Sequence, residues 1–468
     1  MPTEVAPHAR VDVLVGGAGI SGLVAAHRLQ RAGLSVAVLE AAERPGGVIR
    51  SVAQQGRLYE TGPNSALDTS PLIGELVAEL GLGERLRWAS TAASRRYVLR
   101  DGVPMVLPTS PAAFFTTRLF SVSAKLALLR EPFVPPADPH AEESIAAFVR
   151  RRLGSEFLDY VIDPFVSGVY AGDPEQISVQ AAFPKLHALE QRWRSLIRGQ
   201  VFGAAKRRRQ QGVAKNSARS FSFDGGMQVL IDALAAGLHG LHLQTRVSAF
   251  SRDADGGFVV NADAQGEPRS WRARQLVLAV PADAAAALLQ PHAADAAAAL
   301  REIDYAPVAT VASVYARAAI AHALDGFGVL VPRVERRQLL GVLFSSSMFG
   351  GRAPAGEVLL TSFVGGMRQP PLAALPDDEL AALVHGEHQA LLGARQAPLL
   401  QQVTRWPRAI PQYTLGHGGR LARVLAAERG LPGLLFCANW LGGVAVGDCI
   451  KSGYAMADRA LLAHRAAA

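Results

Sequence analysis

Cysteine is scarce in this chain, with only Cys437 and Cys449 among 468 residues. Two thiols cannot form the disulfide framework of a small secreted protein, and no second pair exists to complete a zinc site. Apolar runs of about 18 residues are also absent, so no bilayer-spanning helix is predicted. The residues before Val11 do not resemble a signal peptide. We therefore expect a reduced, cytoplasmic environment and no bound metal.

Acidic residues are outnumbered, because the chain has 40 of them against 48 lysines and arginines, a net charge of +8. A basic excess suits nucleic acid, an anionic membrane surface or an acidic small substrate. The positive residues are scattered apart from two clusters, Arg150–Arg152 and Lys206–Arg209. Neither cluster alternates with aromatic residues that would stack on bases. We therefore expect no nucleic-acid partner.

Motifs of acid–base and nucleophilic catalysis are missing as well. The sequence has no H-E-x-x-H, no nucleophile elbow and no C-x-x-C, and its 12 histidines are scattered. For this reason we assign no catalytic residue. Hydrophobic residues make up 49% of the chain and charged residues 19%, which excludes a disordered protein. At roughly 150 residues per unit, the length predicts about three folding units.

The first forty residues have the order of a dinucleotide-binding fingerprint. Val11–Val15 is a short apolar strand candidate that runs into a glycine-rich turn, Gly16–Gly22. A helical pattern follows, and a second strand candidate, Ser35–Leu39, ends at Glu40. A glycine motif alone is a weak signal. One that lies between a strand and a helix, with an acid after the next strand, strongly indicates a bound dinucleotide.

Each part of this motif has a physical task. Gly17 permits the tight turn, Gly19 allows the backbone to approach a pyrophosphate, and Gly22 lets the helix pack on the strand. The start of the helix offers unpaired amide donors and a partial positive charge to the phosphates. Glu40 is placed to bind ribose hydroxyls, and an acid there disfavours a 2′-phosphate. NAD and FAD share these features, so the following segments must distinguish them.

Two segments after Glu40 resemble the FAD-containing amine oxidase superfamily. Ala41–Arg50 carries a glycine pair soon after the acid, and Tyr59–Asn64 carries the Glu-x-Gly-Pro pattern of that superfamily. In the superfamily, both segments line the flavin and its phosphates. The resemblance therefore implies FAD, rather than a nicotinamide, as the cofactor.

Further segments resemble one branch of the superfamily, the protoporphyrinogen oxidase family with its coproporphyrinogen-oxidising relatives. They are Asp163–Pro174, Phe183–Leu186, Arg194–Gly199 and Leu434–Tyr454. The match runs from Val11 to about Ala457. It implies an α/β chain, α+β overall, in which a Rossmann-type FAD-binding domain is interwoven with a mixed-sheet substrate domain and a helical subdomain.

The domain boundaries follow from the resemblance and from changes in the apolar pattern. We expect an FAD-binding domain at residues 1–87, 205–276 and 410–468. We expect a substrate-binding domain at residues 88–107 and 277–409, and a helical, membrane-associating domain at residues 108–204. Apolar runs bounded by glycine and proline in the second unit predict strands over a flat ligand.

The resemblance implies substrate contacts at five positions. Arg96 falls where the family places an arginine against a substrate propionate, which suits the bidentate pairing of a guanidinium with a carboxylate. Leu330 and Leu343 would cover the macrocycle from one side and Phe363 from the other, and Gly168 belongs to the same set. Without the resemblance, Arg96 would be read as a surface residue and the three large apolar residues as ordinary core.

The resemblance also implies FAD contacts along most of the chain. They are Gly17, Ala18, Gly19, Ile20, Ser21, Gly22, Glu40, Ala41, Arg44, Gly46, Gly47, Val48, Gly62, Pro63, Asn64, Ser65, Val247, Asn439, Val444, Ala445 and Val446. In the family, the backbone of the residue matching Val247 meets adenine, and the Val-Ala-Val backbone near the C-terminus lies at the isoalloxazine ring.

The implied activity is oxidation of protoporphyrinogen IX to protoporphyrin IX in haem biosynthesis, by hydride transfer to FAD. Molecular oxygen would be the final acceptor, and hydrogen peroxide the by-product. Aromatisation drives such a reaction, so the protein mainly positions the reactants, excludes water and tunes the flavin. The alternatives are oxidation of coproporphyrinogen III to coproporphyrin III, an amine or carotenoid oxidase of the same fold, and a non-catalytic flavin- or membrane-binding protein.

Membrane contact and self-association are open at this point. The segment from Pro111 to Pro136 is rich in Phe and Leu and is interrupted by basic residues. Core packing is the simpler interpretation. Apolar helices next to basic clusters can also touch an anionic monolayer, so we expect a peripheral contact with the inner face of the cell membrane. A homodimer is compatible with the sequence, which does not decide the oligomeric state.

Overall fold

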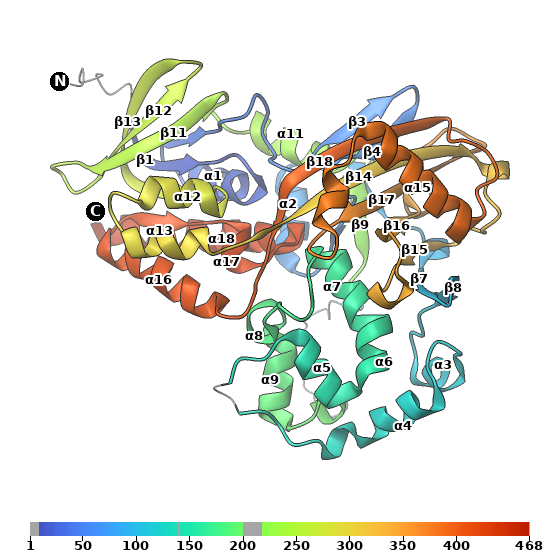
Figure 1. Cartoon of the computed structure of the whole chain (residues 1–468). Helices are drawn as coiled ribbons and strands as arrows, with labels where there is room; N and C mark the ends of the chain where they lie inside the picture. The colour runs from blue at the N-terminus through green and yellow to red at the C-terminus, as the bar shows by residue number, and fades with distance from the viewer. Residues whose placement is uncertain (1–8, 139–140, 200–217, 468) are drawn as a thin grey trace.

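The computed structural model describes residues 9–138, 141–199 and 218–467. The expected α/β architecture is confirmed, since helices surround two seven-stranded sheets. In Figure 1 the first sheet lies on the left and the second on the right, with a group of helices below them. The Lys206–Arg209 cluster, and the end of the expected helical unit at 200–204, lie outside the described residues.

The first sheet has the order β10-β2-β1-β13-β12-β11, and β19 pairs with β13. Its bounds are β1 Ala9–Gly16, β2 Val36–Leu39, β10 Leu241–His242, β11 Thr245–Arg252, β12 Phe258–Ala264, β13 Glu267–Leu278 and β19 Leu434–Phe436. The strands β10, β2, β1, β13 and β19 are parallel, whereas β11 and β12 extend the sheet antiparallel. The predicted strand–turn–helix–strand order is therefore present, with β1 central.

Helices cover both faces of this sheet. On one side lie α1 Ile20–Arg31, α2 Pro71–Glu79, α11 Gln228–Ala236 and α18 Val446–Ala467. On the other side lie α12 Ala282–Leu289, α13 Ala294–Arg301 and α16 His417–Gly430. The sequence-based division put α12 and α13 in the substrate domain, whereas their leucines and alanines pack into the core of the first sheet. The expected boundary at residue 276 falls inside β13.

The second sheet has the order β18-β14-β17-β16-β15-β7-β8. Its bounds are β7 Arg95–Arg100, β8 Val103–Val106, β14 Tyr305–Ala316, β15 Gly326–Leu330, β16 Leu339–Leu343, β17 Glu357–Gly365 and β18 Leu400–Pro411. Only the β7–β15 pairing is parallel. One face packs against α15, Asp377–Leu392, in a core that includes Val329, Val342 and Val364. The opposite face is therefore the one available to a ligand.

The helices below the sheets form a third core. They are α3 Pro111–Thr116, α4 Val122–Arg130, η3 Glu131–Phe133, α5 Ile145–Leu153, α6 Ser155–Phe157, η4 Leu158–Ile162, α7 Asp163–Tyr170, α8 Val179–Ala182 and α9 Pro184–Trp193. Apolar residues of α5, η4 and α7 pack together, as their spacing predicts. Ser144 caps α5 by accepting a hydrogen bond from the Ala147 amide.

Smaller elements join the main parts. They are β3 Ser51–Gln54, β4 Arg57–Glu60, β5 Ala66–Leu67, η1 Gly83–Arg85, β6 Leu86–Trp88, η2 Thr91–Ala93, β9 Ser220–Phe223, η5 Arg317–Ala319, η6 Arg333–Glu335, α14 Ser345–Met348, η7 Pro370–Ala374 and α17 Asn439–Gly442. β3 pairs with β4, and β9 pairs with both β5 and β6. No helix among the described residues is long and apolar enough to cross a bilayer.

Candidate functional site

The turn after β1 can be built only with glycine at two positions. Gly17 has a φ of +103°, and a Cβ placed on it would lie 2.5 Å from the carbonyl oxygen of Ala279. A Cβ on Gly22 would lie 2.2 Å from the carbonyl oxygen of Gly17. Gly19 differs, because a Cβ there would have no described atom within 4 Å. Gly17 and Gly22 are therefore required by the turn and its packing, whereas Gly19 faces open space.

The start of α1 retains the donors that a phosphate needs. Gly19 is its N-cap and offers no side-chain hydrogen bond to the first turn. Ile20 and Ser21 are buried at the start of the helix, where no side chain caps the backbone amides. Such uncapped amides, with the partial positive charge of the helix start, favour an anionic group.

Glu40 lies directly beside this turn. One of its carboxylate oxygens accepts the Ala18 amide at 2.7 Å, and the other accepts the Ala42 amide at 2.9 Å. Its backbone carbonyl accepts the Thr245 amide at the start of β11, the strand that carries Val247. The structure therefore places Glu40, Val247 and the glycine turn at the same edge of the first sheet.

The loop with the glycine pair is attached to the same turn. The Gly46 amide donates to the Ala18 carbonyl at 2.7 Å, and Gly46 has a φ of +103°. The guanidinium of Arg44 donates to the carbonyls of Pro45, Gly47 and Ile49 at 3.2, 2.9 and 2.9 Å. Burial lowers the pKa of Arg44. Arg44 thus fixes the loop from within.

The next predicted segment, Gly62–Ser65, touches this loop. A Cβ on Gly62 would lie 1.9 Å from the carbonyl oxygen of Val48, so only glycine fits. The preceding carbonyl, that of Thr61, accepts the Trp406 indole N–H at 2.7 Å and the Thr310 hydroxyl at 3.1 Å. Sequence reasoning missed these two residues, because nothing near them in the chain indicates that β14 and β18 approach this segment.

The C-terminal segment completes the series of loops. α17 ends at Gly442, Gly443 has a φ of +118°, and α18 starts at Val446. The Tyr413 hydroxyl donates to the Asn439 carbonyl and accepts the Gly443 amide at 2.8 Å. Sequence reasoning also missed Tyr413, which lies just after β18 and far from this loop in the chain. Ala445 is exposed, Val444 is half-buried and Val446 is buried.

These loops form a continuous series that fits FAD. The glycine turn is bonded to Gly46, Val48 meets Gly62, and a Cβ on Gly447 would lie 3.2 Å from the Leu67 carbonyl. Uncapped helical amides, close-packed glycines and an acid at the sheet edge are suited to a diphosphate and a ribose. No cluster of metal-ligating side chains occurs within the described ranges.

The register of the second sheet brings the predicted substrate residues to one face. Two adjacent rows cross four strands: Arg96, Gly328, Leu343 and Thr361, and then Val98, Leu330, Gly341 and Phe363. Directly paired residues, and residues two apart on a strand, point to the same side of a sheet. This side lies opposite the core that α15 covers. Leu330, Leu343 and Phe363 are only half-buried there.

Gly168 joins this face from the helical part. A Cβ on Gly168 of α7 would lie 3.2 Å from Cδ2 of Leu330. Thus α7 lies against this face of the second sheet, and a larger side chain at this position would press on Leu330.

Arg96 is the charged group on these two rows. It forms no ion pair with any described residue, and its guanidinium carbon lies 5.4 Å from the centre of the Phe327 ring. Its side chain is reached by solvent, yet the surrounding protein removes enough hydration to lower its pKa. An unpaired guanidinium beside apolar side chains is suited to a carboxylate on a flat apolar ligand.

Comparison with known proteins gives the family context. Residues 20–461 match the family model described as flavin containing amine oxidoreductase. The chain is 34% identical over 477 residues to protoporphyrinogen oxidase 2, chloroplastic/mitochondrial, of Arabidopsis thaliana, covering 95% of this chain and 93% of that protein. It is 28% identical over 473 residues to coproporphyrinogen III oxidase of Bacillus subtilis (strain 168), covering 96% and 97%.

A solved structure shows the same fold. It comes from Exiguobacterium sp. 255-15 and is provisionally described as a protoporphyrinogen oxidase. The TM-score is 0.80 at 26% identity, and the similarity covers 97% of this chain and 99% of that chain.

Proposed function

We propose that this chain, which belongs to the flavin containing amine oxidoreductase family, is an FAD-dependent oxidase that converts protoporphyrinogen IX to protoporphyrin IX in haem biosynthesis. The observation that carries the proposal is the single sheet face that gathers Arg96, Leu330, Leu343 and Phe363. An unpaired guanidinium and three half-buried apolar side chains match a flat macrocycle with acidic side arms.

The cofactor would be held by the loops that follow β1 and β2 and by the two later segments. The α1 amides and the glycine turn would bind the diphosphate, Glu40 the ribose and Val247 the adenine. The segments Gly62–Ser65 and Asn439–Val446 would contact the flavin ring. Bound FAD supplies the two-electron acceptor that these side chains lack, and molecular oxygen is the proposed final acceptor.

The chain's own residues would bind and orient the substrate. Arg96 would hold a propionate and so fix the rotation of the macrocycle in its plane. Leu330, Leu343 and Phe363 would contact the ring faces and exclude water. The two rows of this face contain no carboxylate and no histidine. Catalysis would therefore depend on positioning and dryness more than on general acid–base chemistry.

Two observations favour protoporphyrinogen over coproporphyrinogen. The first is identity, which is 34% to the Arabidopsis relative against 28% and 32% to the coproporphyrinogen III oxidases of Bacillus subtilis and Propionibacterium freudenreichii. The second is that the two rows of the substrate face offer one guanidinium, that of Arg96. This suits a substrate with two propionates better than one with four.

We expect purified, FAD-loaded protein to oxidise protoporphyrinogen IX faster than coproporphyrinogen III in air. Porphyrin fluorescence measures both rates, and kcat/KM should be higher for protoporphyrinogen. A preference for coproporphyrinogen III would leave the assigned fold and cofactor unchanged, but the reaction would be the oxidation of coproporphyrinogen III to coproporphyrin III. A flavin that stays oxidised with both substrates under anaerobic conditions would support an amine or carotenoid oxidase, or a non-catalytic flavoprotein.

We also propose a peripheral membrane contact through the surface of α3, α4 and η3. Its large apolar side chains are exposed by 50% at Phe115, 72% at Val122, 54% at Leu126, 54% at Leu129 and 81% at Phe133. Three of them lie at positions i, i+4 and i+7 of α4, which is one face of a helix. Arg130 adds an exposed positive charge next to them. These features favour an anionic monolayer.

Vesicle flotation tests this contact. The protein should float with anionic vesicles at low salt and less so at high salt, since salt screens the attraction. Phe133→Ser should lower the bound fraction by about tenfold, because it removes the most exposed apolar side chain of the surface. Leu462→Ser is the matched control, because Leu462 is 66% exposed but lies on α18. Equal loss in both variants would contradict the proposed surface.

A further inference from the structure

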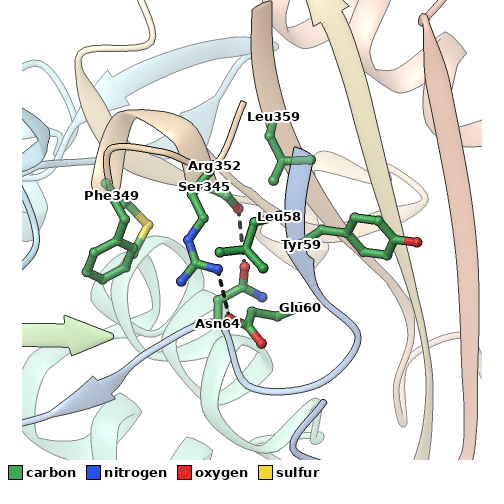
Figure 2. Close-up of a pocket in the computed structure, with 9 residues that line it drawn as sticks. Leu58, Tyr59, Glu60, Asn64, Ser345, Phe349, Arg352 and Leu359 are labelled. Carbon is green, nitrogen blue, oxygen red and sulfur yellow. Dashed lines mark hydrogen bonds and ion pairs between the residues drawn. The ribbon is translucent and has the colours of Figure 1, made fainter. Parts of the chain in front are cut away.

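A buried ion pair joins Glu60 to the part of the chain that forms the second sheet. Glu60 lies two residues before Gly62–Ser65, the segment proposed to contact the flavin. Glu60 and Arg352 are exposed by only 2% and 3%, and Nη1 of Arg352 lies 2.9 Å from Oε1 of Glu60. Figure 2 shows the two side chains pointing toward one another, with the bond drawn as a dashed line. Arg352 lies in the turn between α14 and β17, so it belongs to the second sheet's part of the chain.

The other partners of this pair lie around the FAD loops. Oε2 of Glu60 accepts the Ser51 hydroxyl of β3 at 2.5 Å, and Oε1 accepts the Met227 amide at 3.0 Å. Nη2 of Arg352 donates to the Ser222 hydroxyl of β9 at 2.6 Å. Arg352 comes from the part of the chain that forms the second sheet. The other members of this hydrogen-bond network lie in β3, in β4, in β9 and just before α11.

A second connection holds the other end of the same segment. Oδ1 of Asn64 accepts the Ser345 hydroxyl at 3.2 Å, and the hydroxyls of Ser345 and Thr361 are 2.9 Å apart. Figure 2 shows Ser345 and Asn64 joined beside the Glu60–Arg352 pair. Thr361 lies in the same row of the sheet as Arg96. A polar path therefore leads from the substrate face to the end of the flavin-facing segment.

The buried pair cannot be cut at one end without a large cost. Removal of one partner leaves an uncompensated charge in a site that excludes water, whereas removal of both leaves none. Burial raises the pKa of Glu60, and Arg352 opposes this effect. The guanidinium therefore helps to hold Glu60, in addition to the hydrogen bonds that Trp406 and Thr310 donate to the next carbonyl, that of Thr61.

We propose that Arg352 is a positioning residue for the flavin: through Glu60 it fixes the segment Thr61–Asn64, and with it the FAD affinity and the flavin reduction potential. The inference rests on the proposed contact of Gly62–Ser65 with the flavin, and does not depend on which substrate is oxidised. Its tests use no porphyrinogen, so they can still be interpreted if the protein does not oxidise the proposed substrate.

The experiment compares Arg352→Met with the double variant Glu60→Gln/Arg352→Met. FAD affinity is measured by fluorescence quenching on addition to apoprotein, and the midpoint potential by equilibration with a redox dye. We expect Arg352→Met to weaken FAD binding by about tenfold or more. We also expect a potential shift of about 30 mV, a tenfold change in the ratio of affinities for the two flavin states.

The double variant separates positioning from simple destabilisation. It should recover most of the thermal stability, because no unpaired buried charge remains, but its potential should stay shifted because the guanidinium no longer holds the Glu60 side chain. Arg85→Met is the matched control, since Arg85 pairs with Asp224 at 2.9 Å on the exposed surface. It should change neither flavin property.

If Arg352→Met does not fold, Ser345→Ala tests the same inference at the Asn64 end. It removes one hydroxyl and should shift the potential in the same direction by a smaller amount. A folded Arg352→Met or double variant with the wild-type FAD affinity and potential would overturn the proposal, as would a loss of melting temperature without any change in the flavin. For Ser345→Ala, an unchanged potential would overturn it.

Discussion

Gly19→Ala should abolish most FAD binding while leaving the apoprotein folded. A Cβ at Gly19 meets no described atom within 4 Å, and its φ of −68° is one that alanine adopts. The methyl group would instead occupy the space that a pyrophosphate needs at the start of α1. We expect FAD affinity to fall about 100-fold, roughly 2.7 kcal/mol. Apoprotein stability should fall by no more than about 1 kcal/mol, the cost of alanine at an N-cap.

Titration of apoprotein with FAD and thermal unfolding without FAD separate these effects. Gly74→Ala is the matched control, because Gly74 lies within α2 and a Cβ there also meets no described atom within 4 Å. Alanine in this helix should preserve FAD affinity and leave stability equal or higher. Wild-type FAD affinity in Gly19→Ala would mean that the cofactor does not cross the start of α1.

Arg96→Ala should impair turnover without affecting FAD binding. The guanidinium lacks an ion-pair partner in the described protein, so its removal leaves no buried charge behind. A hydrogen bond to a charged group contributes about 1.5 to 3 kcal/mol, so kcat/KM for the porphyrinogen should fall about 10- to 100-fold. Most of the loss should appear in KM, because the propionate is bound in the ground state and in the transition state alike.

Two variants control for charge and for folding. Arg96→Lys keeps the charge but loses the planar pair of donors, so it should recover only part of the activity. Arg95→Ala removes the same side chain one residue earlier, where it points to the opposite face, is exposed and pairs with the half-buried Asp325. It should leave kcat/KM near the wild-type value. Equal losses of kcat/KM in Arg95→Ala and Arg96→Ala would contradict a substrate-binding role for the sheet face that carries Arg96.

Several residues of the cofactor site could be predicted from local sequence. Gly17, Gly22 and Glu40 could be assigned roles from spacing alone, because a tight turn, a helix start and a sheet edge are set by residues close together in the chain. The structure confirms the strand–helix–strand order and places Glu40 at the Ala18 amide. Arg44 was expected at the cofactor, and it bonds the carbonyls of its own loop.

Residues that act across the chain had no local signal. Trp406 and Thr310 meet at the Thr61 carbonyl, although they are separated from it by 345 and 249 positions. Tyr413 supports the Asn439–Gly443 turn in the same way. Thr310 and Trp406 come from β14 and β18, and Tyr413 lies two residues after β18. Nothing in the sequence around them predicts these contacts.

By itself, the sequence determined the fold class, the FAD fingerprint and the family. These depend on the order of local elements and on motifs whose residues lie close together in the chain. Only the tertiary structure decided that Arg96, Leu330, Leu343 and Phe363 share one face, since that depends on register between strands. It also decided that α12 and α13 pack on the first sheet and that Glu60 and Arg352 pair across 292 positions. Such contacts form when sheet pairing and burial bring distant segments together, and no local pattern encodes them.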